Sequence, residues 1–337
     1  MVEKIEYHGT VLEAPEVEFL TALEELIGAA IPRTSKVEND TFGFEFEGDH
    51  VIRLGFWKKE LTSLPESFGN LSKLKELFLE GNKLSTLPES FGELKNLKYT
   101  NLSDNELTSL PESVGKLKNL ERIDLDKNKL TSLPESFGDL KSLKRLDLDK
   151  NDLTNLPESF GNLKNLEKLF LYQNQLKTLP QSFGNLKNLV YLSLKENKLE
   201  SLPESIGSLK NLETLDLDEN ELTSIPGSIC NLKNLKELYL YRNKLDCLPE
   251  EFGSLKNLEE LYLYGNQLKD LPESFGDLKN LNYVSLYNNQ ISCLPESVRN
   301  LKNLTYINLD ENELEPLSEP LELWMKLLRR NGCSIYK

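Results

Sequence analysis

The chain has 337 residues, with 55 Asp and Glu against 40 Lys and Arg, which gives a formal net charge of -15. Nucleic acids and anionic membranes are usually met by basic surfaces, so this charge argues against both as main partners and leaves a basic or polar protein surface. No apolar run reaches the roughly 18 residues of a membrane span, and the first residues lack a basic region followed by an apolar run, so we expect a cytoplasmic protein.

The first 49 residues differ from the rest of the chain and predict a cap. Apolar residues lie at helical spacing over residues 16–31, and Pro32 ends that pattern. Three phenylalanines then alternate with other residues over 42–46, which predicts a strand that leads into a second strand at residues 50–57. A helix plus a hairpin arm would cover the open edge of the sheet that follows.

A 23-residue period runs through residues 50–315. One asparagine marks each copy, and eleven of them keep the spacing without a slip: Asn82, Asn105, Asn128, Asn151, Asn174, Asn197, Asn220, Asn243, Asn266, Asn289 and Asn312. Around each lies the frame L-x-x-L-x-L-x-x-N-x-L-x-x-L-P-x-x-F-G-x-L-x-x. A leading twelfth copy has Lys59 where the asparagine belongs. A fixed period of this length predicts a solenoid with one coil per copy.

Each position of the frame has a physical reason. The leucines of L-x-L point to the same side of a short strand, and the flanking leucines reach that interior only if the chain then turns. The asparagine can donate and accept hydrogen bonds at this turn, and the proline begins an outer segment for which we expect short helical turns. Thr100 replaces a core leucine, and Cys230 and Arg299 replace the outer glycine.

The repeat ends after Leu314, and residues 316–337 predict a closing helix. Leu321, Trp324 and Leu328 have the spacing of one helical face. The expected fold is therefore α/β: a right-handed solenoid with a parallel concave sheet, a horseshoe of twelve repeats. Its parts are an N-terminal cap at 1–49, the solenoid at 50–315 and a C-terminal capping helix at 316–337.

The frame resembles the leucine-rich repeat family. The 23-residue form with L-P-x-x-F-G-x-L is similar to the intracellular Ras-group class of repeats, the class of Shoc-2, Ras suppressor protein and the Roco proteins. The resemblance covers roughly residues 50–315. It implies a small GTPase or a signalling-complex component as partner, by analogy.

The sequence contains no phosphate loop, dinucleotide fingerprint, nucleophile elbow or H-E-x-x-H zinc motif. Both histidines, His8 and His50, fall in the N-terminal cap, where a lone histidine is more often structural than catalytic. The four cysteines match no metal-binding spacing, so we expect free thiols. We expect no enzyme activity, no cofactor and no metal site.

When the copies of the repeat are compared, the strand residues vary most at the positions six, four and two before each asparagine. These positions share the strand with the leucines but point away from them, onto the concave face. Aromatic residues predicted to form a binding surface there are Tyr239, Tyr241, Tyr262, Tyr264, Tyr283 and Tyr287, with Phe170, Tyr172 and Tyr191 nearer the middle, where Phe78 is expected to join them.

Two interpretations of these aromatic residues remain open. Aromatic side chains favour strands and stabilise a sheet by stacking along it. Large exposed aromatic patches also mark binding surfaces, and tyrosine is a preferred binding residue because it buries much area with few rotatable bonds. We favour the binding of a protein partner.

Charged residues occupy the same positions in the middle of the sheet. The predicted cluster consists of Arg122, Asp124, Asp126, Arg145, Asp147 and Asp149, with Asp216 and Asp218 farther along. Stacked carboxylates repel one another, and the arginines offset this only in part. The cluster could face a Lys or Arg of a partner, a divalent ion, or solvent alone; because its groups lie on separate coils, we predict no metal site.

The sequence thus predicts a non-enzymatic protein-interaction module, monomeric, in signalling or scaffolding. The partner would be another protein with a basic surface or a small GTPase, and neither nucleic acid nor a membrane. The alternative is a self-associating or structural repeat protein without a specific client.

Overall fold

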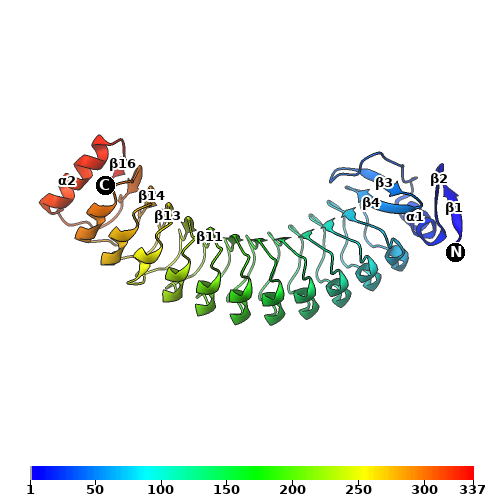
Figure 1. Ribbon diagram of the computed structural model, residues 1–337, viewed down its shortest axis with the longest axis horizontal. Helices are drawn as coiled ribbons and strands as arrows, with labels where there is room; N and C mark the ends of the chain where they lie inside the picture. The colour runs from blue at the N-terminus through cyan, green and yellow to red at the C-terminus, as the bar shows by residue number, and fades with distance from the viewer. Residues whose placement is uncertain (1) are drawn as a thin grey trace. The chain divides into compact units, whose positions relative to one another are not determined.

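The computed structural model describes residues 2–337 and divides the chain into two compact units, Met1–Leu169 and Phe170–Lys337. In each unit short strands alternate with short outer turns along the chain (Figure 1). The twelve repeats supply the twelve strands β4 to β15.

The first unit begins with a cap. Its elements are β1 (Lys4–Tyr7), β2 (Thr10–Glu13), α1 (Ala14–Ile27), β3 (Phe42–Glu47) and β4 (His50–Phe56). The predicted helix is present but ends at Ile27, because Gly28 takes a left-handed conformation (φ 66°) and donates its N–H to the Glu24 carbonyl. The expected hairpin arm is β3 paired antiparallel with β4. The hairpin of β1 and β2 was not predicted.

The repeats of the first unit follow β4. Their strands and 3-10 turns are η1 (Glu66–Asn70), β5 (Glu76–Phe78), η2 (Glu89–Glu93), β6 (Tyr99–Asn101), η3 (Glu112–Lys116), β7 (Arg122–Asp124), η4 (Glu135–Asp139), β8 (Arg145–Asp147) and η5 (Glu158–Asn162). Strands β4 to β8 pair in parallel, each residue beside the one 23 positions later, as Arg122 is beside Arg145. The next strand, β9 (Lys168–Phe170), contains the boundary between the units.

The second unit repeats the pattern. Its elements are η6 (Gln181–Asn185), β10 (Tyr191–Ser193), η7 (Glu204–Ser208), β11 (Thr214–Asp216), η8 (Gly227–Asn231), β12 (Glu237–Tyr239), η9 (Phe252–Ser254), β13 (Glu260–Tyr262), η10 (Glu273–Asp277), β14 (Tyr283–Ser285), η11 (Glu296–Asn300), β15 (Tyr306–Asn308), α2 (Glu319–Arg330) and β16 (Ser334–Tyr336). Strands β10 to β16 form one parallel sheet. The closing helix is confirmed as α2, while β16 was not predicted.

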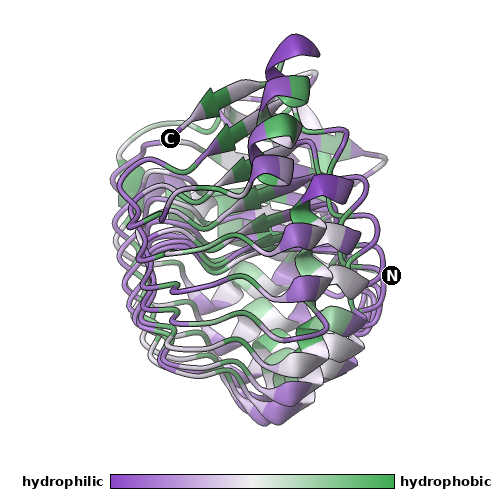
Figure 2. Ribbon diagram, turned by 90° about the vertical axis from the view of Figure 1, so that its left-hand side faces the viewer, coloured by the Kyte–Doolittle hydropathy of each residue, from purple (hydrophilic) through white to green (hydrophobic). Residues whose placement is uncertain are grey.

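The interior of each unit is a stack of the frame leucines. Leu125, Leu130, Leu143 and Leu146, for example, have no exposed surface, and Phe137 of the outer turn fills the space opposite the strand. The strands appear in the hydrophobic colour and most connecting loops in the hydrophilic colour in Figure 2. Burial of these apolar side chains drives the folding of each coil against its neighbours.

The frame asparagine joins successive coils, as predicted. Asn128 accepts a hydrogen bond at Oδ1 from the Leu107 N–H (3.0 Å) and donates through Nδ2 to the Leu102 and Leu125 carbonyls (3.0 Å each). The side chain thereby satisfies backbone groups that no strand ladder reaches. Lys59 takes no such role, and its backbone N–H donates to Asn82 Oδ1 instead.

The position immediately before each asparagine is left-handed throughout. Its φ is 53° at Lys127 and 54° at Glu219, and only Gly81 and Gly265 are glycines there. A left-handed residue turns the chain sharply out of the strand. The sequence does not reveal this position, because residues with ordinary side chains occupy most copies.

The predicted departures from the frame have structural consequences. Thr100 has no exposed surface, and its hydroxyl finds no hydrogen-bond partner among the described residues. A buried hydroxyl without a partner lowers stability. Cys230 places a side chain where other coils have glycine, and the following turn η9 is reduced to the three residues Phe252–Ser254. All four cysteines are free, as predicted.

Candidate protein-binding surfaces

The side of the sheet that faces away from the leucine core is called the open face here. It consists of the positions six, four and two before each frame asparagine. On β12 to β15 these positions hold seven tyrosines, three acidic residues, one serine and one asparagine, and no lysine or arginine: Glu237, Tyr239, Tyr241, Glu260, Tyr262, Tyr264, Tyr283, Ser285, Tyr287, Tyr306, Asn308 and Asp310.

Four tyrosines of this face form a continuous stack. The ring centroids of Tyr239 and Tyr262 are 4.7 Å apart, those of Tyr262 and Tyr283 are 4.7 Å apart, and those of Tyr283 and Tyr306 are 4.4 Å apart. Tyr336 of β16 continues the row at 5.6 Å with a tilted ring. The row crosses every strand from β12 to β16, because parallel strands bring their side chains within contact distance of one another.

A shorter second row runs beside the first. The rings of Tyr241 and Tyr264 stack at 4.5 Å, and Tyr287 follows at 6.5 Å. The Lys195 ammonium donates to the Tyr241 hydroxyl (2.6 Å), and this hydroxyl donates in turn to Glu219 Oε1 (3.0 Å). The two rows, Tyr239, Tyr262, Tyr283, Tyr306 and Tyr336 with Tyr241, Tyr264 and Tyr287, are called the tyrosine surface below.

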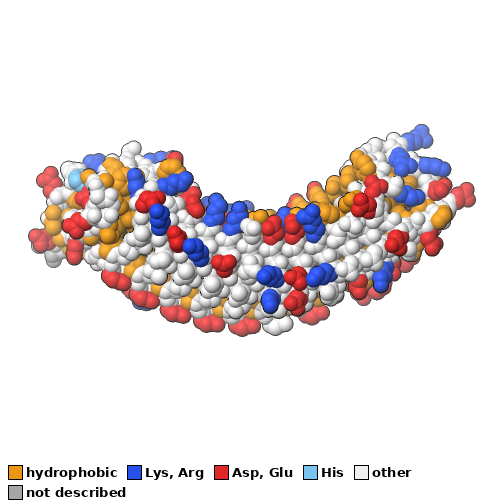
Figure 3. Space-filling view, turned by 180° about the vertical axis from the view of Figure 1, so that it is seen from behind, with side chains coloured by type: hydrophobic (Ala, Val, Ile, Leu, Met, Phe, Trp, Pro, Cys, Tyr) orange, Lys and Arg blue, Asp and Glu red, His pale blue; other side chains and the backbone are white. Residues whose placement is uncertain are grey.

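Carboxylates hold several tyrosine hydroxyls in place. Tyr262 donates to Glu260 (2.9 Å) and Tyr239 donates to Glu237 (3.3 Å), both within the same strand. Burial, together with the hydrogen bond and charge of Glu260, raises the pKa of Tyr262 above its ordinary value, so the hydroxyl stays protonated. Figure 3 shows hydrophobic side chains gathered over the sheet of the second unit, with acidic side chains beside them.

The structure brings together the predicted residues Tyr239, Tyr241, Tyr262, Tyr264, Tyr283 and Tyr287 and adds two that the prediction omitted. Tyr306 occupies an open-face position of the last repeat, so the repeat pattern contained the signal needed to find it. Tyr336 lies on β16, a strand outside the repeat, and no pattern in the sequence pointed to it.

The aromatic residues near the middle lie apart from the tyrosine surface. Phe170 and Tyr191 contact each other, with ring centroids 5.0 Å apart. Tyr172 is in the same repeat as Phe170. The expectation that Phe78 joins this group is wrong, because Phe78 is buried in the first unit and packs edge-on against Tyr99 at 5.4 Å.

Within the charged cluster of the first unit, Asp124 is the carboxylate that the chain itself pairs most closely. Asp124 is only 4% exposed and receives two hydrogen bonds from Arg122, at 3.0 Å from Nε and 2.6 Å from Nη2. The Tyr99 hydroxyl also donates to it (2.9 Å), and Arg145 lies 4.0 Å away. Arg122 thus pairs with Asp124 in the bidentate geometry that is among the strongest for a carboxylate in a protein. Together with burial, the Asp124 charge still raises the pKa of the neighbouring Asp147, so the arginines offset the carboxylates only in part.

Asp126 and Asp147 are held more loosely than Asp124. Asp126 accepts a hydrogen bond from the Ser103 hydroxyl, and Asp147 is 3.6 Å from Arg145 and accepts the Asp149 N–H. Burial raises the pKa of Asp147 to about 6, although that hydrogen bond acts in the opposite direction. Asp126 and Asp147 are therefore acidic groups through which this part of the open face can meet a cation.

The acidic pair of the second unit is more deeply placed. Asp216 accepts a hydrogen bond from the Ser193 hydroxyl (3.2 Å), and Asp218, 3% exposed, accepts the Tyr241 N–H (2.9 Å). Burial, with the neighbouring Asp216 charge, raises the pKa of Asp218 to about 8. At neutral pH Asp218 is mostly uncharged, so this surface is less negative than the sequence predicts.

Replacing Asp218 by asparagine should stabilise the protein at alkaline pH. The folded pKa of about 8 exceeds that of an unfolded aspartate, so the native state loses stability as pH rises from about 4 to about 8 and no further above that. Asparagine keeps an acceptor for the Tyr241 N–H and carries no charge. We expect Asp218→Asn to match wild type near pH 4 and to exceed it by about 5 kcal/mol at pH 9, measured by urea denaturation. An equal difference at both pH values would contradict the assigned titration.

One group in the N-terminal cap could offer ligands to a metal. Glu13, Asp49 and His50 each present one ligand atom, and these atoms lie within 4.8 Å of one another. The Lys4 ammonium already pairs with Asp49 at 2.5 Å, and His50 is 3.3 Å from the buried Glu16 carboxylate. The group is therefore already supplied with cationic and hydrogen-bonding partners from the chain itself.

No helix within residues 2–337 combines the length and the apolar character needed to cross a membrane.

The chain belongs to the leucine-rich repeat family. The family model described as a leucine-rich repeat region matches residues 90–189 and 177–269, which is more than half of the chain. Further leucine-rich repeat models match residues 54–107 and 256–297. Domains of this family typically serve as protein-binding modules and are generally not catalytic. No protein of curated function matches the sequence.

Solved structures show the same fold. A leucine-rich repeat protein of Leptospira interrogans is 35% identical, with a TM-score of 0.57 over 85% of this chain and 89% of that one. A chain of the PEPR1–AtPEP1 complex is 31% identical, with a TM-score of 0.75 over 89% of this chain and 44% of that one. A chain of the Toll–Spatzle complex from Drosophila is 26% identical, with a TM-score of 0.66 over 78% and 41%. This chain thus spans less than half the length of the latter two.

Proposed function

We propose that this protein is a non-enzymatic interaction module that binds a protein partner with a basic surface on its tyrosine surface. One observation carries the proposal: the open face of β12 to β15 presents seven tyrosines and three acidic residues and no lysine or arginine. A surface of this composition attracts cationic groups over its whole length and repels anionic ones.

The geometry of the tyrosine surface favours binding over a purely structural role. Stacking between neighbouring coils already fixes the rings, so a partner loses little tyrosine flexibility on docking. The rings remain partly exposed, and their hydroxyls sit beside Glu237 and Glu260. Rigid aromatic area with polar groups at its edge is the usual composition of a binding hot spot.

The charged cluster of the first unit would form a separate surface for basic groups of a partner. In this role Asp126 and Asp147 meet basic side chains of the partner, while Arg122 and Arg145 hold Asp124 and orient the cluster. Surface charges of this kind set orientation and association rate more than affinity. In the second unit Phe170, Tyr172, Tyr191 and Asp216 would extend the contact of the tyrosine surface, whereas Asp218 is too buried to reach a partner.

The resemblance to Ras-group repeats supports a role in signalling or scaffolding, with a small GTPase as one class of partner. Two of the similar structures are complexes of a leucine-rich repeat chain with another molecule, PEPR1 with AtPEP1 and Toll with Spatzle. A cytoplasmic location agrees with four free cysteines. A pull-down with this protein from lysates loaded with GDP or with GTP tests the link to a GTPase, because a GTPase partner would be retained in amounts that depend on the nucleotide.

Changing Tyr239, Tyr241, Tyr262 and Tyr264 together to serine should abolish partner capture. The variant removes the stacked centre of the tyrosine surface and leaves the leucine core unchanged. We expect a partner retained from an extract of the source cell by the wild type to be lost, at least tenfold in amount. Circular dichroism first establishes that the variant is folded.

A matched control changes the exposed outer-turn residues Glu204, Glu250 and Glu273 to serine and should retain the partner. Equal capture by wild type and the tyrosine variant would contradict the proposal. The tyrosines would then be residues that stabilise the sheet. Light scattering at several concentrations addresses the alternative of self-association, because a monomer throughout excludes it over that range.

A further inference from the structure

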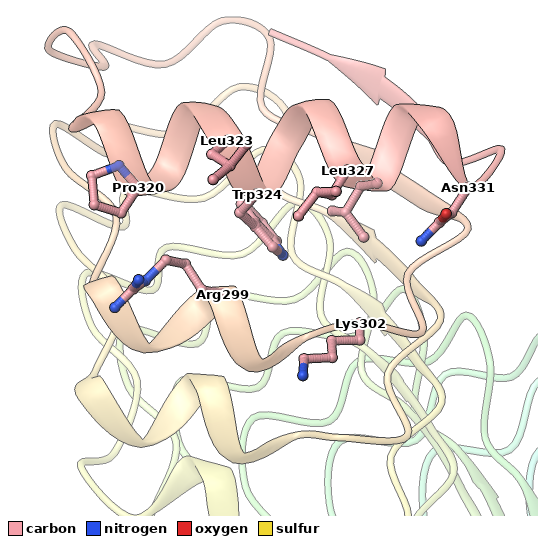
Figure 4. A pocket seen from close by; sticks show the side chains of 8 residues that line it. Arg299, Lys302, Pro320, Leu323, Trp324, Leu327 and Asn331 are labelled. Carbon is pink, nitrogen blue, oxygen red and sulfur yellow. The ribbon is translucent and has the colours of Figure 1, made fainter.

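The C-terminal cap contains a cleft between α2 and the last outer turn, η11. The cleft has a volume of about 310 Å³, at the lower end of the roughly 300 to 1,000 Å³ of small-molecule sites. Its walls are apolar, from Pro320, Leu323, Trp324 and Leu327. Figure 4 shows Arg299 and Lys302 on the side opposite the helix, with the Trp324 and Leu327 side chains pointing toward them.

The lysine of this cleft lacks the contact that four of its counterparts in earlier coils make with the next outer turn. At Lys187, Lys210, Lys233 and Lys256 the ammonium donates to a carbonyl of the next outer turn, at 3.0 to 3.3 Å. Lys302 belongs to the last coil, which no outer turn follows. Its ammonium has neither a hydrogen bond nor an ion pair among the described residues, so three donors are available to a ligand.

The arginine of the cleft is also specific to this coil. Apart from the coil with Cys230, the other coils have glycine here because the next outer turn lies against it; at Gly276 a Cβ would be 2.1 Å from the Ser297 carbonyl oxygen. Arg299 is accommodated because α2 replaces the next turn. Its Nε donates to Glu296, which leaves the two terminal nitrogens of the guanidinium for another acceptor.

Two leucines on the helix side remain uncovered. Leu323 and Leu327 are 57% and 50% exposed, one helical turn apart, while α2 buries Leu321, Trp324, Met325 and Leu328 against the coil. The cleft therefore combines exposed hydrocarbon with two cations whose donors are only partly used, in a chain of net charge -15. A ligand that satisfies both features carries a negative head group and an apolar body.

We propose that this cleft is a binding site for a small aliphatic anion, one negative head group joined to a short hydrocarbon chain. The head group accepts hydrogen bonds from Lys302 and Arg299, and the chain covers Leu323, Trp324 and Leu327. The site lies on the side of the outer turns, so its occupation does not depend on the tyrosine surface.

Trp324 provides a direct measurement. In a Trp57→Phe background it is the one remaining tryptophan, and octanoate should change its fluorescence saturably, with a matching heat in calorimetry. Octyl phosphate distinguishes a phosphate head group from a carboxylate. Butanoate should bind more weakly than octanoate because it covers less of Leu323 and Leu327, and octylamine should not bind because its charge is reversed.

Variants test the role of the two cations. Lys302→Gln and Arg299→Gly should each weaken octanoate binding about fivefold. Lys256→Gln, two coils earlier and already bonded to the Asp277 carbonyl, is the matched control and should bind as wild type. The variant with four tyrosines changed to serine should also bind octanoate normally, which separates this site from the proposed protein partner.

Three results would overturn the proposal. They are the absence of a saturable fluorescence change and heat, equal binding of octylamine and octanoate, and wild-type affinity in both Lys302→Gln and Arg299→Gly. Trp57, Lys256, Arg299 and Lys302 are exposed and the four tyrosines are half-buried, and circular dichroism checks that each variant is folded.

Discussion

Gly138→Ala should destabilise the protein by about 3 kcal/mol, although it adds a single methyl group. A Cβ at this position would lie 2.1 Å from the backbone carbonyl oxygen of Ser159 and 2.6 Å from its carbonyl carbon, both in the next outer turn. Backbone atoms cannot rotate away as a side chain does, so the two turns must move apart and open the packing around Phe137. Overpacking of this kind costs about 1 to 3 kcal/mol or more.

The same chain offers a matched control and a natural example. Gly227→Ala should be neutral or slightly stabilising, since a Cβ there meets no atom within 4 Å. Cys230 already has a side chain at the frame glycine position, and the turn after it is shortened to Phe252–Ser254. Urea denaturation of both alanine variants measures the difference; equal midpoints would contradict the steric argument.

Asn220→Ala should cost about 3 kcal/mol by leaving a buried backbone group without a partner. Asn220 Oδ1 accepts the Leu199 N–H (3.0 Å), and its Nδ2 donates to the carbonyls of Leu194 (2.9 Å) and Leu217 (3.0 Å). The loss is uneven. Leu194 keeps a donor from Asn197, whereas the buried Leu199 N–H loses its acceptor. A buried unsatisfied donor costs about 1 to 3 kcal/mol, and the small cavity adds to this.

An exposed asparagine of the same unit serves as control. Asn211 donates to the Lys187 carbonyl (2.9 Å) at the surface, where water can replace it. Asn211→Ala should therefore cost less than about 1 kcal/mol. A similar loss in both variants, measured by the same denaturation, would mean that burial of the amide is not what makes the frame asparagine necessary.

The candidate site was predictable to the extent that it follows the period. The sequence places Tyr239 beside Tyr262 and Tyr241 beside Tyr264, because each residue lies next to the one 23 positions later. The contact between Tyr262 and Tyr283 joins residues 21 positions apart, across two different columns of the open face. Which ring leans toward which neighbour depends on side-chain direction, and the repeat frame does not specify it.

The sequence by itself determined the fold, because a 23-residue period with leucine, asparagine, proline and glycine at fixed places satisfies the core and the backbone in one way. The tertiary structure alone decided which open-face groups are available. It buries Asp124 against Arg122, raises the pKa of Asp218, adds Tyr336 through β16 and leaves Lys302 without a following turn. The reason is physical: burial, charge and hydrogen bonding at each position depend on groups contributed by neighbouring coils and caps, whereas the period depends only on the coil itself.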